Sequence, residues 1–230
     1  MSTFPDSLYV FDPENPFPLL PVEALFSQRS KSHAKGADKF LGFNLEAVEQ
    51  EVRQSRHGEL LGQFETWAHL DPQIFLTPYL ELRYITEKIS LSKGETLVDL
   101  GCAYARLPFV ISNRFKNEVH FLGYDCVPHR ILESERVLKL HGIPAQLFTQ
   151  NICTEAFQIP EAEHFFIYDT GTSSDVEKLL EKIRVFTRSR PSAIKSLVAR
   201  GARARHIIHE KHPWLPPPIE DNQNFIIYLF

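Results

Sequence analysis

The sequence predicts an α/β protein built on a doubly wound, mainly parallel β-sheet with helices on both faces. From residue 95 onward, short apolar runs alternate with segments of helical spacing. This order requires crossover connections, which give parallel strands covered by helices. The chain has 230 residues, of which 43% are hydrophobic and 23% are charged. Such a composition excludes a disordered chain, and the length suffices for one sizeable domain and an additional segment.

Several helix boundaries can be assigned from capping signals. Thr77 is expected to be an N-cap, with Pro78 at the first helical position. Gly142 is expected to end a helix, and Ser174 and Glu177 form a capping-box pattern that opens another. The predicted strands are 96–100, 120–124, 145–149, 164–168, 194–199 and 224–230. The predicted helices are 107–115 and 128–141, with further helices opening at 174 and at 202.

The N-terminal part of the chain has a different character. Residues 4–20 combine prolines with many apolar side chains, which is too apolar for a solvated linker, so we expect this stretch to pack against the rest of the protein. Residues 27–39 are polar and basic and are expected to form a solvated loop. Two helices are predicted, at 44–57 and 59–70. We therefore expect a helical appendage over residues 1–71 and the main domain over residues 72–230.

Charge and composition restrict the classes of partner. The 25 basic and 29 acidic residues give a net charge of −4, so nucleic acid is not an expected partner. The absence of a long apolar run predicts no membrane association, and the absence of a signal peptide or a C-x-x-C pair predicts the reducing cytoplasm. His206, His209 and His212 spread around a helix instead of sharing one face, so no metal site is expected.

The stretch from Thr96 to Leu107, T-L-V-D-L-G-C-A-Y-A-R-L, carries the strongest chemical signal. A buried strand leads into a tight turn of small residues, and a helix begins directly after it. Helix N-termini offer free N–H groups to a ligand, and doubly wound sheets bind ligands beyond the carboxyl ends of their strands. Asp125 ends the next predicted strand, where such sheets place an acid for ribose hydroxyls. The pattern therefore predicts a nucleotide-type site.

The same stretch indicates which nucleotide is expected. A dinucleotide site requires G-x-G-x-x-G, and the matching positions here are Gly101, Ala103 and Arg106. An arginine cannot serve as the third glycine, whose role is to let the helix pack closely on the strand. Asp99 would face a pyrophosphate unfavourably but can accept a hydrogen bond from an ammonium group. The ligand is expected to carry a cation, which disfavours a nicotinamide-dependent oxidoreductase.

With these features the chain resembles the class I S-adenosylmethionine-dependent methyltransferases. Asp99, Leu100, Gly101 and Cys102 match the first motif of that family, roughly D-L-G-C-G-x-G. The resemblance covers about residues 72–230 and is greatest to small prokaryotic enzymes of the protein-lysine type. It implies a Rossmann-like fold with a seven-stranded mixed sheet, S-adenosylmethionine as cofactor, and methyl transfer to an acceptor nitrogen, with a protein lysine as the specific candidate.

The resemblance also implies roles for individual residues. The cofactor-binding set is Asp99, Gly101, Cys102, Ala103 and Ala105 for the methionine part, Asp125 for the ribose hydroxyls and Asn151 for the adenine amino group. Tyr168 and Asp169, at the end of the fourth strand, are the expected catalytic residues near the transferable methyl group. Ala103 and Ala105 stand where the family prefers glycine, and an alanine forced to positive φ costs about 1–2 kcal/mol.

Other interpretations remain open for several of these features. Asn151 is also a favoured turn residue, and Asp169 can simply begin the turn at 170–171. The alternative function is a non-catalytic binding or scaffold protein that keeps the fold while its glycine turn has drifted. Cofactor binding without turnover would indicate that alternative.

Overall fold

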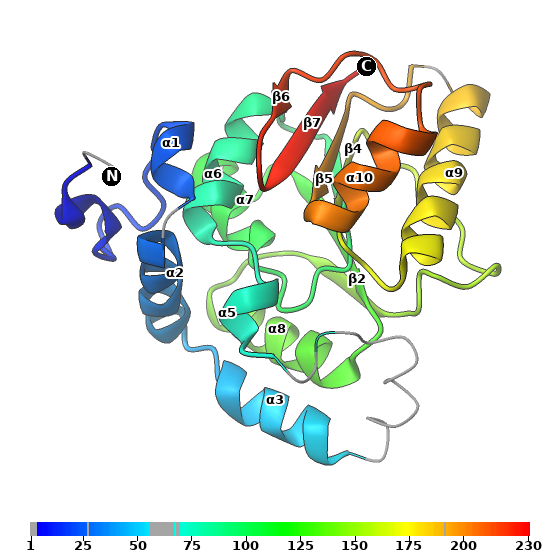
Figure 1. The fold of residues 1–230 in the computed structure, drawn as a ribbon. Coiled ribbons are helices and arrows are strands. Elements are labelled where there is room, and N and C mark those ends of the chain that lie inside the picture. The colour runs from blue at the N-terminus through cyan, green and yellow to red at the C-terminus, as the bar shows by residue number, and fades with distance from the viewer. Residues whose placement is uncertain (1–3, 27, 56–66, 68–69, 191) are drawn as a thin grey trace.

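The computed structural model describes residues 4–26, 28–55, 67, 70–190 and 192–230. Within these residues it contains a seven-stranded sheet of order β3-β2-β1-β4-β5-β7-β6, which confirms the predicted fold class (Figure 1). The strands are β1 (Thr96–Leu100), β2 (His120–Asp125), β3 (Gln146–Thr149), β4 (His164–Tyr168), β5 (Ser196–Arg200), β6 (Glu220–Asp221) and β7 (Phe225–Leu229). All six predicted strands are present, and β6 is an additional short strand at the sheet edge.

The helices lie before, between and after the strands. They are the 3-10 helix η1 (Asp6–Tyr9) and the α-helices α1 (Val22–Leu25), α2 (Gln28–Leu41), α3 (Leu45–Gln54), α5 (Pro72–Phe75), α6 (Tyr79–Lys88), α7 (Leu107–Phe115), α8 (Pro128–Leu140), α9 (Ser173–Ser189) and α10 (Ala202–Lys211). None of the helices in the described part of the chain combines the length and the apolar character needed to span a bilayer.

The order of the strands determines where a ligand can bind. Strands β1 to β5 are parallel, and β7 runs antiparallel between β5 and β6. The chain proceeds from β1 outward to β2 and β3, and then returns to the other side of β1 to form β4 and β5. Ligands of doubly wound sheets bind at such a reversal, beyond the carboxyl ends of the strands.

Alternate residues of each strand face two separate cores. Leu97 and Phe166 belong to the core beneath α2, α6, α7 and α8, whereas Val98 and Ile167 belong to the core beneath α9 and α10. The two groups of helices lie on opposite sides of the sheet (Figure 1). Because both faces of the central strands are covered, β1, β4, β5 and β7 are mostly buried and mostly apolar, which explains why their positions could be predicted.

Two helix starts differ from the prediction. Helix α9 has its capping box at Thr172 and Asp175, so the box predicted at Ser174 is wrong. The N-cap of α6 is Pro78, and Thr77 makes no side-chain cap, so that prediction is wrong by one residue. The carbonyl oxygen of Thr77 accepts a hydrogen bond from Arg106 instead, at 3.1 Å.

The predicted solvated loop at 27–39 is wrong, because α2 occupies this region. The residues that α2 buries recur every three or four positions, as a packed helix requires: Ser30, His33, Ala34, Ala37, Asp38 and Leu41. Most of them are small or polar, so hydrophobicity does not reveal the pattern. Gly36 lets the N-terminal segment approach, since a Cβ atom at Gly36 would lie 2.9 Å from Cβ of Phe11.

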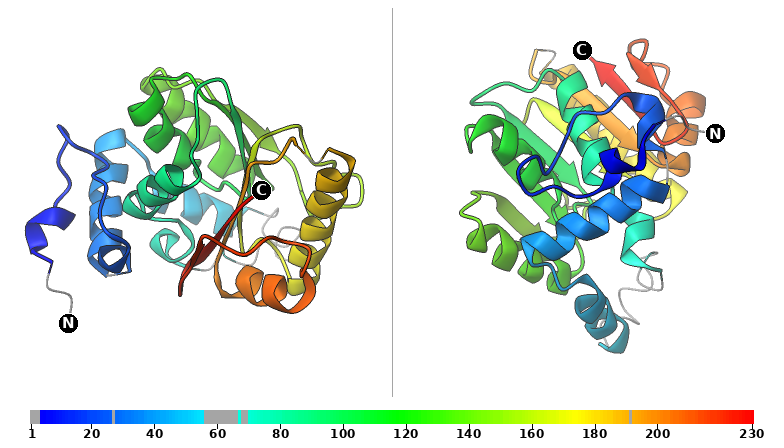
Figure 2. Two further views of the ribbon diagram at one scale, coloured as in Figure 1. Left: turned by 90° about the horizontal axis from the view of Figure 1, so that it is seen from above. Right: turned by 90° about the vertical axis from the view of Figure 1, so that its left-hand side faces the viewer.

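The N-terminal segment packs against the body of the protein, as predicted (Figure 2). The rings of Phe17 and Tyr79 stack at 5.0 Å, and the Tyr9 hydroxyl donates a hydrogen bond to the Ala24 carbonyl at 2.8 Å. Helices α1, α2 and α3 share a core with α6, α7 and α8. The helix predicted at 59–70 falls almost wholly outside the described residues, and the domain division at residue 71 stays a prediction.

A buried ion pair joins α2 to the residue that precedes α7. Arg106 Nε lies 3.1 Å from Asp38 Oδ1, and its Nη2 pairs with Asp38 Oδ2; the two side chains are 3% and 5% exposed. Gln73 Oε1 accepts from the same guanidinium at 3.0 Å, and the Tyr79 hydroxyl donates to Asp38 Oδ1 at 2.9 Å. The network explains why an arginine occupies the third-glycine position, because its side chain holds the N-terminal helix instead of allowing close strand packing.

A second buried ion pair joins α3 to α8. Arg130 Nε lies 2.7 Å from Glu49 Oε1, and Arg130 Nη2 lies 3.0 Å from Glu49 Oε2. The Tyr104 hydroxyl donates to Glu49 Oε1 at 2.8 Å, so the turn after β1 also contacts α3 through this carboxylate. The two N-terminal helices thus each contribute one buried acid that fixes the surroundings of that turn.

Replacing the acid of the first pair is expected to destabilise the fold strongly. Asp38→Asn leaves the Arg106 guanidinium buried without its counter-charge, a change that costs about 3–5 kcal/mol. Urea denaturation measures the change in the free energy of unfolding. Asp6→Asn is the control, because Asp6 pairs with Arg29 at 3.0 Å on the surface and is 85% exposed, and such pairs contribute about 1 kcal/mol or less. Equal effects of the two substitutions would contradict the role given to the buried pair.

Candidate functional site

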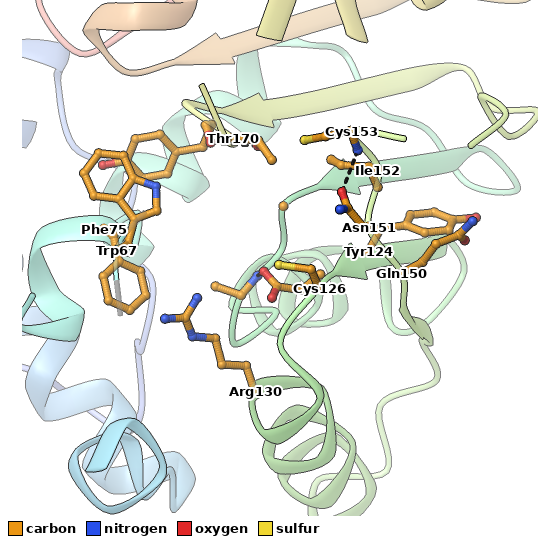
Figure 3. A pocket seen from close by; sticks show the side chains of 15 residues that line it. Trp67, Phe75, Tyr124, Cys126, Arg130, Gln150, Asn151, Ile152, Cys153 and Thr170 are labelled. Atoms are coloured by element: carbon orange, nitrogen blue, oxygen red, sulfur yellow. Dashed lines mark hydrogen bonds between the residues drawn. The ribbon is translucent and has the colours of Figure 1, made fainter. Parts of the chain in front are cut away.

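A cavity of ≈50 Å³ lies beyond the carboxyl ends of β1 to β4, at the place where the strand order reverses (Figure 3). Its lining residues are Trp67, Phe75, Gly101, Ala103, Tyr124, Asp125, Cys126, Arg130, Gln150, Asn151, Ile152, Cys153, Tyr168, Thr170 and Gly171. Five of the nine predicted site residues line it, namely Gly101, Ala103, Asp125, Asn151 and Tyr168. The other four, Asp99, Cys102, Ala105 and Asp169, do not. A larger groove of ≈620 Å³ lies away from the strand ends, between α2, α3 and α5.

The turn after β1 approaches both neighbouring strands. The N–H groups of Gly101 and Cys102 both donate to the carbonyl of Tyr124 at 2.9 Å. Gly101 has φ +102°, and a Cβ atom there would lie 2.6 Å from Thr170 Oγ1. Only glycine therefore fits at this position. Cys102 is buried, and burial raises the pKa of its thiol well above the usual value, so it packs as an inert side chain.

Ala103 and Ala105 both adopt left-handed backbone conformations, with φ values of +47° and +44°. The strain expected for alanine at glycine positions is therefore present at both residues. Ala105 is fully buried, and its N–H donates to the Cys102 carbonyl at 2.8 Å, which closes the turn tightly. The backbone keeps the shape that glycines would permit at lower cost.

Asp125 holds the turn and the start of α8 together. Its Oδ2 accepts from the Ala103 N–H at 3.0 Å, and its Oδ1 accepts from the Val127 N–H at 2.8 Å. The side chain is buried, and burial raises its pKa, opposed mainly by the nearby charge of Arg130 and by these two backbone N–H groups. Each carboxylate oxygen keeps further acceptor capacity towards the cavity, as a ribose contact requires.

Asp99 is buried, and its Oδ1 has no hydrogen-bond partner among the described residues. It lines a second cavity of ≈30 Å³, which shares Phe75, Gly101, Ala103 and Tyr168 with the first. Burial, and secondarily the charge of Asp125, raises the Asp99 pKa to about 8. At neutral pH this carboxyl group is mostly protonated, and it lacks the cation that would stabilise its charged form.

Asn151 faces the cavity from the loop after β3, and its Oδ1 accepts from the Cys153 N–H at 2.9 Å (Figure 3). This hydrogen bond is typical of a turn formed by an asparagine, which is the alternative to adenine binding that the sequence left open for Asn151. The expected adenine contact stays a prediction, and the side-chain NH₂ group is the part of Asn151 not engaged in this bond.

Of the two predicted catalytic residues, Tyr168 lies at the cavities and Asp169 lies at the start of α10. Tyr168 lines both cavities, and its hydroxyl donates to the Ile74 carbonyl at 3.3 Å. Burial raises its phenol pKa, so it does not act as a base at neutral pH. Asp169 has φ +26° and turns away to α10, where its carboxylate accepts from the N–H groups of Arg203 and Ala204 at 3.3 and 2.7 Å. The geometry favours a helix-capping role for Asp169.

Several cavity residues carry no signal in the sequence. Trp67 precedes the predicted main domain, Phe75 ends the short helix α5 at its start, and Thr170 follows β4 in an ordinary turn pattern. Only Asp71, which caps α5 by accepting from the Gln73 N–H at 2.8 Å, marks the segment that positions Phe75. The Asp71-Pro72 pair is typical of a helix start, although it also fits the end of the helix predicted at 59–70.

The histidines of α10 are engaged with acids near them. His206 Nε2 lies 3.3 Å from Glu210 Oε2, and His209 Nε2 lies 3.3 Å from Asp221 Oδ2. His212 accepts from the Trp214 indole at 2.9 Å. The described residues contain no group of three or more metal-binding side chains placed to hold an ion.

No family model matches the chain, and no curated protein matches its sequence. Similar solved structures include an RNA methyltransferase from Salinibacter ruber in complex with S-adenosyl-L-homocysteine, which is 14% identical, covers 64% of this chain and 88% of its own, and has a TM-score of 0.48. A SAM-dependent methyltransferase from Aquifex aeolicus is 11% identical, with coverage of 81% and 97% and a TM-score of 0.45. TrmN from Thermus thermophilus is 13% identical, with coverage of 67% and 49% and a TM-score of 0.46. Two of the three are named as methyltransferases, and none names a protein lysine.

Relieving the strain at Ala103 is expected to stabilise the protein. Ala103→Gly removes a left-handed alanine and raises the free energy of unfolding by about 1 kcal/mol. Ala47→Gly is the matched control, because Ala47 is exposed within α3 and loses about 1 kcal/mol by helix propensity. Urea denaturation distinguishes the two. Destabilisation by both substitutions would show that the turn is unstrained.

The raised pKa of Asp99 predicts a dependence of stability on pH. Between pH 4 and pH 8 the folded protein keeps a proton that the unfolded chain releases, so this group lowers the free energy of unfolding as pH rises. Asp99→Asn resembles the protonated form, and we expect it to exceed the parent in stability at pH 8 by more than about 1 kcal/mol. The difference should vanish near pH 4 in urea denaturation. A difference independent of pH would contradict the assignment.

Proposed function

We propose that this protein is an S-adenosylmethionine-dependent methyltransferase that transfers the methyl group to an acceptor nitrogen. The observation that carries the proposal is the buried, unpartnered Oδ1 of Asp99 beside a glycine turn at the strand ends. An ammonium group of a ligand would supply the missing partner. Asp125, at the end of the neighbouring strand, stands where doubly wound sheets bind ribose hydroxyls.

The side chains at the site have the chemistry that this cofactor requires, but the two cavities are smaller than a typical ligand site. Ligand sites commonly enclose about 300–1,000 Å³, whereas the two cavities have volumes of ≈50 and ≈30 Å³. Phe75, Gly101, Ala103 and Tyr168 line both cavities. Movement of these side chains on binding would enlarge the space available to the cofactor.

The roles of the residues follow from their places. Asp99 and the turn from Gly101 to Ala105 would hold the methionine part, Asp125 the ribose and Asn151 the adenine. When bound, the cofactor supplies an activated methyl group on a sulfonium. Tyr168 would border the acceptor side, where its half-buried ring, held by the bond of its hydroxyl to the Ile74 carbonyl, helps to align the acceptor. Alignment alone can contribute roughly 7–11 kcal/mol to such a displacement.

The identity of the acceptor is the finer part of the proposal. A protein lysine is the candidate that the sequence resemblance suggests. A lysine must lose a proton before attack, at a cost of about 4.6 kcal/mol at pH 7 for a pKa of 10.4. The carboxylate nearest the end of β4, that of Asp169, caps α10 instead of facing the cavity. This geometry favours a nitrogen acceptor that is neutral before it binds.

A non-catalytic binding protein is the second candidate function. The left-handed alanines and the narrow cavities favour it, because both limit the space available to a cofactor. The two candidates differ in a single respect that can be measured, the formation of S-adenosylhomocysteine from S-adenosylmethionine in the presence of acceptors.

Calorimetric titration with S-adenosylmethionine and S-adenosylhomocysteine tests the cofactor site. We expect micromolar binding of both by the parent protein and at least about tenfold weaker binding by Asp125→Asn, a loss of about 1.4 kcal/mol. Asp169→Asn is the matched control, because it removes a strand-end carboxylate that caps α10 and should leave affinity unchanged. Thermal unfolding verifies that both variants are folded.

Two results would contradict the assignment. Unchanged affinity in Asp125→Asn would remove that residue from the site. Loss of affinity in Asp169→Asn with retention in Asp125→Asn would place the ligand beside α10 instead.

A further inference from the structure

We propose that the methyl acceptor is a planar heteroaromatic compound that presents an unprotonated ring nitrogen and stacks against Trp67 and Phe75. The inference rests on the proposed function, which it deepens by naming the acceptor class. Three sets of contacts carry it: the aromatic side of the cavity, the arginines placed over its rings, and the engagement of the neighbouring acids.

One side of the cavity is aromatic. Trp67, Phe75 and Tyr168 line it, and Trp67 lies beside Phe75 opposite Asn151 and Cys153 (Figure 3). The expected adenine contact at Asn151 would place the nucleoside on the polar side and leave the aromatic side for the acceptor. Aromatic side chains bind planar rings by stacking, worth several-fold to about a hundredfold in affinity per ring.

Each of these three rings has a guanidinium group over one face. The guanidinium carbon lies 4.6 Å from the Phe75 centroid for Arg130, 4.3 Å from the Tyr168 centroid for Arg200, and 6.0 Å from the Trp67 centroid for Arg203. Glu49 and Glu81 neutralise the first two arginines. The Arg203 guanidinium donates to the carbonyls of Gly171 and Asp169, and these bonds do not cancel its charge.

The arginines change what the rings can recognise. A cation binds to an aromatic ring through the negative potential of its face. In this cavity guanidinium groups already use that potential, and an ammonium-bearing acceptor beside Trp67 would meet the positive charge of Arg203, whose guanidinium donates only to carbonyl groups in the contacts described. A neutral, planar ring meets no such repulsion and gains stacking on the cavity side. The aromatic side therefore favours an uncharged heterocycle over an amine that is protonated at neutral pH.

The acids near the aromatic side are not placed to remove a proton from the acceptor. Asp125 accepts two backbone N–H groups, Asp169 caps α10, and Asp99 is itself mostly protonated at pH 7. At that pH only about one lysine amine in a few thousand is neutral. A heteroaromatic ring nitrogen needs no such help, because its lone pair is available in the neutral molecule.

The transfer then balances without a base. The ring nitrogen donates its lone pair to the methyl carbon, and the carbon–sulfur bond breaks as its electron pair returns to sulfur. The positive charge passes from the sulfonium to the ring, and no proton is taken up or released. The product ring is a cation beside Arg203, so repulsion between these two positive charges favours its release.

The test uses the fluorescence of Trp67. The chain has two tryptophans, and Trp214 lies at the rim of the other core, where it contacts His212 and Phe230. Trp214→Phe therefore leaves Trp67 as the only tryptophan in the full-length protein. The variant is first titrated with S-adenosylhomocysteine by calorimetry, and then, when saturated, with quinoline, adenosine or n-butylamine while Trp67 emission is recorded.

We expect quinoline or adenosine to quench Trp67 saturably and n-butylamine to have no effect. Formation of S-adenosylhomocysteine from S-adenosylmethionine should follow the same preference, and the active probe distinguishes a simple heterocycle from a nucleoside. Variants of Trp67 lack this fluorescence, so their probe binding is measured by calorimetry. Trp67→Ala should weaken binding of the planar probe at least tenfold while the affinity for S-adenosylhomocysteine stays within twofold. Trp67→Phe should recover most of the lost probe binding, which a merely structural role would not predict.

The failures are distinguishable. No binding of S-adenosylhomocysteine would overturn the proposed function and the acceptor inference with it. Binding of S-adenosylhomocysteine without quenching by either planar probe, or methylation of n-butylamine in preference to both, would leave the proposed function standing and overturn the inference.

Discussion

The ion pair between Arg106 and Asp38 is the interaction on which the candidate site depends. It joins α2 to the residue at which the turn after β1 becomes α7, and it also engages Gln73 of α5. Burying two charges is costly unless every polar atom finds a partner, and here Thr77, Gln73 and Tyr79 complete the set. The N-terminal helices therefore determine the shape of the turn, which in turn determines the space available to a ligand.

The strain at Ala103 and Ala105 is understandable in that setting. The turn is held from one side by Asp125 and from the other by the Tyr104–Glu49–Arg130 network. Contacts on both sides can hold the alanines in left-handed backbone conformations that an isolated loop would avoid.

Much of the fold could be predicted because the sheet is buried on both faces. Strands β1, β2 and β4 are mostly apolar, and α7 agrees with its predicted range at both ends. Helix α2 was missed because its packed face is made of Ser30, His33 and Ala34, whose burial depends on the N-terminal segment that lies over them. The start of α9 was misplaced because Thr172 and Ser174 offer equivalent local caps.

The candidate site was only partly predictable, because some of its residues depend on contacts between segments that are far apart in the sequence. Asp99, Gly101 and Asp125 follow from strand ends, which local sequence reveals. The capping role of Asp169 depends on the position of α10, and the presence of Trp67 and Phe75 in the cavity depends on tertiary packing. Neither can be inferred from spacing.

Hydrogen exchange with and without S-adenosylhomocysteine tests most directly the claim that the ligand binds at the strand ends. This account predicts that the ligand protects the backbone amides of residues 101–106, 125–127 and 150–153 and does not protect those of residues 35–50, around the larger groove. Protection confined to the larger groove would contradict the account.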